Sequence, residues 1–131
     1  MGSAVNAGTK RWLVGEAEQI LDRVQGQDGF RDQTSQLRNL VQIVQEESEV
    51  SVLRNFIRYQ TGRKTTSKFW SLIHKDVIKV LEEIEKNLTG EDLRKAAIQQ
   101  FFGYLVRHYV YLDKVNRDGR GPGRAQAGGR R

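Results

Sequence analysis

The 131-residue sequence contains no cysteine, a single proline and no long run of apolar residues. The absence of cysteine excludes disulfides, thiolate metal sites and a cysteine nucleophile, and it is consistent with the reducing cytoplasm in which we expect the protein. No apolar run approaches the roughly 18 residues that identify a membrane span, so we expect no association with a membrane. The one proline, Pro122, leaves the chain from Thr9 to Asp113 free of that residue, which favours long helices.

Acidic residues are missing from one long segment of the chain. Residues 50–75 hold six lysines and arginines and neither aspartate nor glutamate, and so contribute +6. Residues 116–131 contribute a further +4, and because the whole chain carries +6, the remainder carries −4. Positive charge is thus confined to two segments of a mildly acidic chain, a distribution typical of nucleic-acid-binding proteins.

Apolar residues recur with helical spacing between these termini, as in Leu37, Leu40, Val41 and Val44 at i, i+3, i+4 and i+7. We therefore predict an all-α fold: a compact bundle of about five helices in one domain over residues 10–115. The termini, 1–9 and 116–131, are small, polar or rich in Arg and Gly, and are predicted to be disordered. The predicted helices cover about residues 10–25, 32 or 34 to 47, 48–61, 65 or 66 to 88, and 89–114.

Capping residues and glycines set the predicted helix boundaries. We expect Thr9 and Ser48 to be N-caps, Thr89 to begin a capping box, and Gly62 to end the third helix in a left-handed conformation. The core face of that helix is predicted to comprise Val52, Leu53, Phe56, Ile57 and Gln60. The fifth helix carries apolar residues beyond a single stripe, Val110 among them, which indicates that it is either central or at a subunit interface.

The third predicted helix carries arginines without a local counter-charge. Arg54 and Arg58 lie one turn apart, and neither has an acidic residue three or four positions away. A phosphate group of another molecule would supply the missing charge. Arg38 would join them if the second and third helices packed as an antiparallel hairpin, and cations so spaced suit phosphate contacts better than base reading. The candidate nucleic-acid-binding residues are Arg38, Arg54, Arg58, Arg63, Lys64 and Lys68.

No constellation in the sequence predicts catalysis. The two histidines, His74 and His108, lie on different predicted helices without a ligand-spaced partner. The carboxylates cluster at 46–49 and 82–85, where a solvated helix face explains them better than acid–base chemistry does. We therefore predict a non-enzyme with no catalytic residue, no metal site and no cofactor.

Sequence motifs occur in three segments, Thr34–Leu40, Leu53–Arg63 and Phe101–Tyr109. These segments resemble the small helical subunit of the type III-A CRISPR effector, the Csm complex. Thr34-Ser-Gln-Leu-Arg-Asn-Leu40 is similar to that family's Thr-Ser-Gln-Ile/Leu-Arg opening, and Leu53-Arg-Asn-Phe-Ile-Arg-Tyr-Gln-Thr-Gly-Arg63 is similar to its basic helix ending in Tyr-x-x-Gly/Ala-Arg. Phe101-Phe-Gly-Tyr-Leu-Val-Arg-His-Tyr109 looks like its closing segment, with Gly103 and Tyr104 where Glu-Ala is more usual. The resemblance covers about residues 34–112.

This resemblance implies a scaffold role in antiviral defence. Copies of that subunit stack beside the duplex of guide RNA and target RNA, contact target-strand phosphates and leave cutting to other subunits. The expected partners are therefore that duplex, the other Csm subunits and further copies of this chain. Two alternatives stay open: a helix-turn-helix DNA-binding protein that uses the second and third helices, and a helical adaptor whose basic surface binds an acidic protein.

Overall fold

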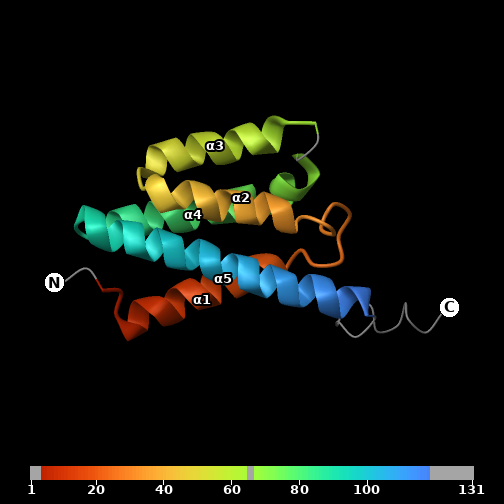
Figure 1. The fold of residues 1–131 in the computed structure, drawn as a ribbon, viewed down its shortest axis with the longest axis horizontal. Helices are drawn as coiled ribbons and strands as arrows, with labels where there is room; N and C mark the ends of the chain where they lie inside the picture. Colours follow the sequence, from red (N-terminus) through yellow and green to blue (C-terminus); the bar gives the residue numbers. More distant parts are fainter. Residues whose placement is uncertain (1–3, 65–66, 119–131) are drawn as a thin grey trace.

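The computed structural model describes residues 4–64 and 67–118, and in these ranges it contains five helices and no strand. The predicted all-α fold is thereby confirmed (Figure 1). The ends for which disorder was predicted, 1–3 and 119–131, and the two threonines predicted to open the fourth helix lie outside the described residues. The helices are α1 (Ala7–Asp22), α2 (Thr34–Glu46), α3 (Val50–Gly62), α4 (Ser67–Asn87) and α5 (Glu91–Arg117).

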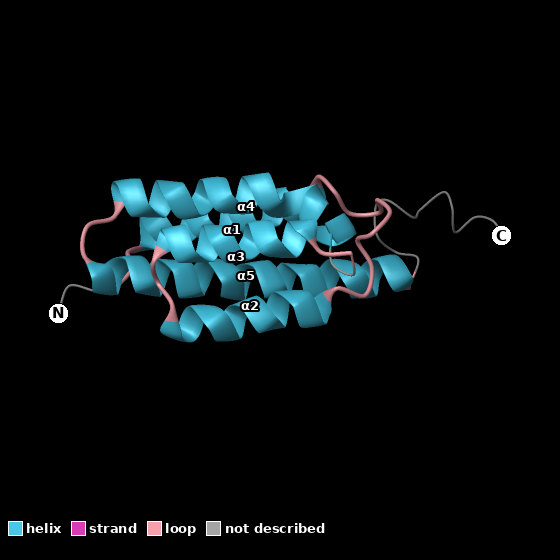
Figure 2. Ribbon diagram, turned by 90° about the horizontal axis from the view of Figure 1, so that it is seen from above, coloured by secondary structure: helices cyan, strands magenta, loops and turns pink. Residues whose placement is uncertain are grey.

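The longest helix, α5, lies at the centre of the bundle. It packs mainly against α1 and α2, whereas α3 packs mainly against α4. In Figure 1, α3 runs along the upper edge of the molecule and α1 along the lower edge. Figure 2 shows α4 and α2 on opposite sides. The helix with the predicted basic residues, α3, is therefore a peripheral element with one side left open.

The core contains most of the apolar residues that helical spacing predicts. On α5 the buried positions recur with helical spacing and lie on one broad face of the helix, although its apolar residues spread beyond that face. The prediction that Val52 belongs to the core is wrong, because this residue is 47% exposed; Val110, from the wide apolar set of the fifth helix, is 39% exposed. Both lie on helix sides that no neighbour covers, and on α3 it is Val50 that is buried instead. The buried residues of α5 are Ala97, Ile98, Phe101, Phe102, Leu105, Tyr109, Leu112 and Asn116.

The first helix begins earlier than predicted. Its N-cap is Asn6, whose side-chain oxygen accepts a hydrogen bond of 2.8 Å from the Thr9 backbone N–H. Thr9 therefore lies inside the first turn and is not the cap. Val5, ahead of the cap, is buried in the core, so the disorder predicted for residues 4–9 is wrong.

Three other predicted ends also differ. The N-cap of α3 is Glu49, without a side-chain cap bond, so Ser48 does not cap it. Gly62 is the last residue of α3 and does not adopt a positive φ. The capping box at Thr89 does not form, because Gly90 is the N-cap of α5, with a φ of 97°. At its far end α5 continues to Arg117, so the packed structure extends past residue 115.

The loop between α1 and α2 is anchored to α5 through two aromatic residues. Phe30 is buried, and its ring centroid lies 4.9 Å from that of Tyr109. The Tyr109 hydroxyl donates a hydrogen bond to the Phe30 carbonyl and accepts one of 2.9 Å from the Gln33 backbone N–H. Burial raises the pKa of Tyr109 to about 12, because the phenolate would lose hydration in the core. This anchor fixes where α2 begins.

Candidate nucleic-acid interface

Four of the six predicted binding residues lie on three different helices, the other two follow α3, and the six do not form one cluster. Arg38 is on α2, Arg54 and Arg58 are on α3, and Lys68 is in the first turn of α4. Arg63 and Lys64 follow the end of α3. All are exposed except Arg54, which is half-buried. The ion pairs that they form divide them into two groups.

Arg54 and Lys68 have counter-charges within the protein. The Arg54 guanidinium lies 3.0 Å from the Glu82 carboxylate of α4, and Lys68 Nζ lies 2.5 Å from the Asp28 carboxylate. Lys68 also holds the pKa of Asp28 below its usual value. The prediction that Arg54 lacks a counter-charge is therefore wrong. Its partner is 28 residues away in sequence, beyond the three or four positions over which helix neighbours interact.

Arg58, Arg63 and Lys64 form no ion pair with any described residue, and no carboxylate occurs between residues 50 and 64. This side of α3 is consequently positive and has an uncompensated charge at its centre and at its C-terminal end. A polyanion is the partner that such a surface suits. The exposed residues of α3 are Ser51, Val52, Asn55, Arg58, Tyr59 and Gly62.

The packing of α3 on α4 indicates that two lysines of α4 lie on the same side of the helix pair as Arg58. The two helices run in opposite directions (Figure 1), and the Arg54–Glu82 pair fixes their register. Arg58 lies one turn beyond Arg54 on α3, a rise of about 6 Å. Because the helices are antiparallel, Arg58 is opposite the turn of α4 that precedes Glu82. Lys75 and Lys79, both exposed, occupy the same stripe of α4 as Glu82. We define Arg58, Lys75 and Lys79 as the α3–α4 seam.

Lys79 was not among the predicted site residues. It lies outside the acid-free segment, and Asp76 separates it from Lys75 in sequence. A signal was nevertheless present, because positions 75, 79, 82 and 86 share one helix stripe and three of them are lysine. Charge counted along the chain misses such a set, whereas charge counted along a helix face would find it.

Arg38 is not part of the seam. The condition for Arg38 to join, a close hairpin of α2 and α3, is not met, because α2 packs mainly on α5 and α3 packs mainly on α4. Arg38 instead lines an open hollow of about 490 Å³ on the outer side of α2. It is the only charged residue among those that line the hollow, which are Thr34, Ser35, Arg38, Asn39 and Gln42.

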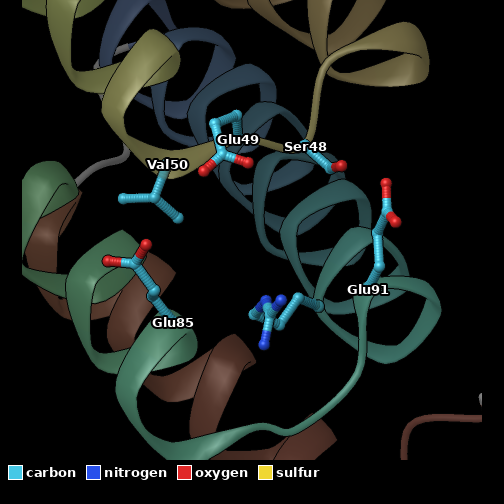
Figure 3. A pocket seen from close by; sticks show the side chains of 6 residues that line it. Ser48, Glu49, Val50, Glu85 and Glu91 are labelled. Carbon is cyan, nitrogen blue, oxygen red and sulfur yellow. The ribbon is translucent and has the colours of Figure 1, made fainter.

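A second hollow, of about 160 Å³, lies where α3 begins, α4 ends and α5 begins. Figure 3 shows that Glu49, Glu85 and Glu91 come to it from three different segments. Arg94 also lines it and donates a hydrogen bond of 3.2 Å to the Leu88 carbonyl. Three carboxylates beside one guanidinium repel a phosphate, so this end of the bundle limits the extent of the positive surface.

The histidines have structural partners. His74 Nδ1 lies 3.0 Å from the Trp70 carbonyl oxygen, one turn back on α4, and His108 Nε2 lies 2.8 Å from the Asp22 carboxylate. Within residues 4–64 and 67–118, no group of three or more histidine, aspartate or glutamate residues is arranged to hold a metal ion. None of the helices described there is both long enough and apolar enough to cross a membrane.

No protein-family model matches this chain, and no curated protein or solved structure is significantly similar to it. The resemblance to the Csm small subunit therefore stays a prediction from the three sequence motifs. The geometry of α3 and α4 supplies separate support for a polyanionic partner, because it depends on ion pairs and register and not on the motifs.

Proposed function

We propose that this chain is a non-catalytic RNA-binding protein of the cytoplasm, which contacts the phosphate backbone through the α3–α4 seam. The observation that carries the proposal is that Arg58 lacks an acidic partner among the described residues, on a helix side without carboxylates. Arg54, one turn earlier, has such a partner in Glu82. A protein that needed both arginines only for stability would be expected to pair both.

The sequence motifs extend the proposal to a particular assembly. We place the chain as the small subunit of a type III-A CRISPR effector in antiviral defence. Its partners would be the duplex of guide RNA and target RNA, other Csm subunits and further copies of itself. Its contacts would be with phosphates, because guanidinium and ammonium groups on helix flanks reach the backbone more readily than base edges.

The two alternatives are supported less well by the geometry. A helix-turn-helix motif needs two helices that cross steeply, with the second one free to enter a groove. In Figure 1, α2 and α3 run in nearly opposite directions. A helical adaptor for an acidic protein would use the same cations, and its partner would bind without RNA.

The experiment that separates these functions is purification of the untagged protein from its own cells, followed by sequencing of bound nucleic acid and mass spectrometry of bound proteins. We expect guide RNA together with other Csm subunits. Duplex DNA of one preferred sequence would support the helix-turn-helix alternative. An acidic protein without RNA would support the adaptor, and either result would contradict the proposal.

A further inference from the structure

A large aromatic side chain stands exposed on the carboxylate-free side of α3. Tyr59 is 60% exposed, although it belongs to a helix whose other face is packed in the core. The guanidinium carbon of Arg63 lies 5.6 Å from the centroid of the Tyr59 ring. Val52, also exposed, is seven residues earlier and therefore on the same side of the helix. Folding of this chain does not account for this arrangement.

A tyrosine ring beside a guanidinium is a good surface for a nucleobase. Every base has an apolar π-face that stacks on an aromatic side chain, and a neighbouring arginine adds attraction both to the rings and to the adjacent phosphate. Tyr59 follows Arg58 on α3 and points about 100° away around the helix. A strand that contacts Arg58 at the α3–α4 seam and crosses α3 would therefore bring its bases to the ring. A protein partner could also bury Tyr59, but the surrounding positive charge without carboxylates favours a nucleotide.

We propose that Tyr59 and Arg63 form a stacking platform, and that the RNA strand crossing α3 presents an unpaired base to it. The inference rests on the proposed function and refines it: the guide–target RNA duplex would be interrupted, or would end, where it crosses α3, so that one base there is unpaired. A base within a continuous helix has both faces covered by its neighbours, so a ring on a protein surface stacks on a base that is unpaired or at an end. The seam holds phosphates, and the platform selects single-stranded RNA over a continuous duplex.

The test compares three fluorescently labelled RNAs of equal length in binding titrations with the full chain at low salt. These are a single strand of mixed sequence, an abasic strand with the same number of phosphates, and a continuous duplex. The variants are Tyr59→Ala, Tyr59→Phe and the matched control Tyr111→Ala, which removes a tyrosine that is 59% exposed on α5. Circular dichroism melting checks that each variant is folded.

We expect Tyr59→Ala to weaken binding of the single strand by roughly tenfold, within the range that loss of one stacked base produces. The dependence of affinity on salt should not change, because the ring carries no charge. Tyr59→Phe, which keeps the ring, and Tyr111→Ala should bind like the wild type. Wild-type protein should bind the abasic strand and the duplex more weakly than the single strand. Tyr59→Ala should bind the single strand and the abasic strand, which carry equal numbers of phosphates, nearly equally, and should lose the preference for the single strand over the duplex.

Two results would overturn the inference and leave the proposed function standing. One is that the wild type binds RNA and Tyr59→Ala binds the single strand equally well; if that variant also fails to assemble with other subunits, Tyr59 is a protein contact. The other is that the wild type prefers the continuous duplex to the single strand. If the wild type binds none of the three RNAs at low salt, the proposed function and the inference both fail.

Discussion

Tyr59 on α3 and Tyr111 on α5 are almost equally exposed, but their surroundings differ in charge. The Tyr59 ring has the Arg63 guanidinium beside it, on a helix side without carboxylates. The Tyr111 ring stacks on the imidazole of His108, with ring centroids 6.0 Å apart, and His108 is in turn paired with Asp22. Exposure of an aromatic residue therefore does not by itself indicate a nucleic-acid site. The charge of its neighbours makes the distinction.

The helices beneath the two tyrosines differ as well. α5 packs against both α1 and α2 and has buried residues along most of its length, whereas α3 packs mainly on α4. A side chain on the open side of α3 therefore contributes little to the stability of the bundle. Buried residues of α5 are thus expected to stabilise the bundle, whereas exposed residues of α3 are available to bind a partner.

The largest effects on stability should come from residues buried against α5. Phe102→Ala and Leu40→Ala should each lower the free energy of unfolding by about 2–5 kcal/mol, as cavity-forming substitutions do. Tyr59→Ala and Tyr111→Ala should change it by less than about 0.5 kcal/mol. Urea denaturation measures all four. A cost for Tyr59→Ala as large as that for Phe102→Ala would show that this tyrosine is structural.

A smaller effect is expected from the hydroxyl of the buried tyrosine on α5. Tyr109→Phe removes the donor to the Phe30 carbonyl and the acceptor for the Gln33 N–H. Buried groups left without partners cost about 1–3 kcal/mol, and we expect a loss of that size in the free energy of unfolding. Tyr111→Phe is the control and should be nearly neutral. Equal effects of the two substitutions would contradict the anchoring role of Tyr109.

The same residue predicts how stability depends on alkaline pH. The pKa of Tyr109 is raised from 10 to about 12 in the folded protein, so below pH 10 both states are protonated and the shift has no effect. Between pH 10 and 12 the unfolded chain loses the proton first, and the free energy of unfolding should fall. Tyr109→Phe should be less stable at neutral pH but show a weaker decline in this range. If the free energy of unfolding of Tyr109→Phe falls as steeply as that of the wild type, other groups cause the decline.

The smallest effects should distinguish the two arginines of α3. Arg54→Ala breaks the partly exposed pair with Glu82 and should cost at most about 1 kcal/mol. Arg58→Ala should be neutral or slightly stabilising, because it relieves repulsion along the helix. A double-mutant cycle on Arg54 and Glu82 measures the coupling between them. If the coupling is near zero and the two arginine substitutions have equal effects, Arg54 and Arg58 do not differ as a paired and an unpaired cation, which contradicts the basis of the seam.

Helical spacing was sufficient to predict the fold because the core of this protein is built from amphipathic helices. Residues such as Leu37, Leu40 and Val44 repeat with the period of the helix and are buried together on α2. Phe30 could not be predicted in this way, because it enters the core from a loop. The predicted caps at Thr9, Ser48 and Thr89 were wrong. The residue at which a helix begins depends on a few local hydrogen bonds and dihedral angles, which the apolar periodicity does not report.

The candidate site could be predicted only in part. Because α3 contains no aspartate or glutamate, the sequence correctly identified Arg58 as a residue without an acidic partner on its own helix. The same reasoning failed for Arg54 and Lys68, whose partners are 28 and 40 residues away and come near only through packing. Lys79 joins Arg58 for the same reason. Neighbours along a chain can be counted from the sequence, whereas neighbours across a seam depend on which helices pack and in which register.

The central claim, that the α3–α4 seam binds phosphates, is tested most directly by the salt dependence of single-stranded RNA binding. Each phosphate neutralised contributes a slope of about −0.7 to a plot of log affinity against log salt concentration. Three to five contacts predict a slope of roughly −2 to −3.5 for the wild type. The double variant Arg58→Ala/Lys79→Ala should flatten this slope by about 1.4.

The charge-matched control is Lys10→Ala/Arg11→Ala, which removes two exposed cations from α1, at the edge of the molecule opposite α3 (Figure 1). We predict that this control keeps the slope and the affinity of the wild type, while the seam variant has a flatter slope and a lower affinity. An affinity that does not depend on salt, or an equal loss in the two double variants, would contradict the claim.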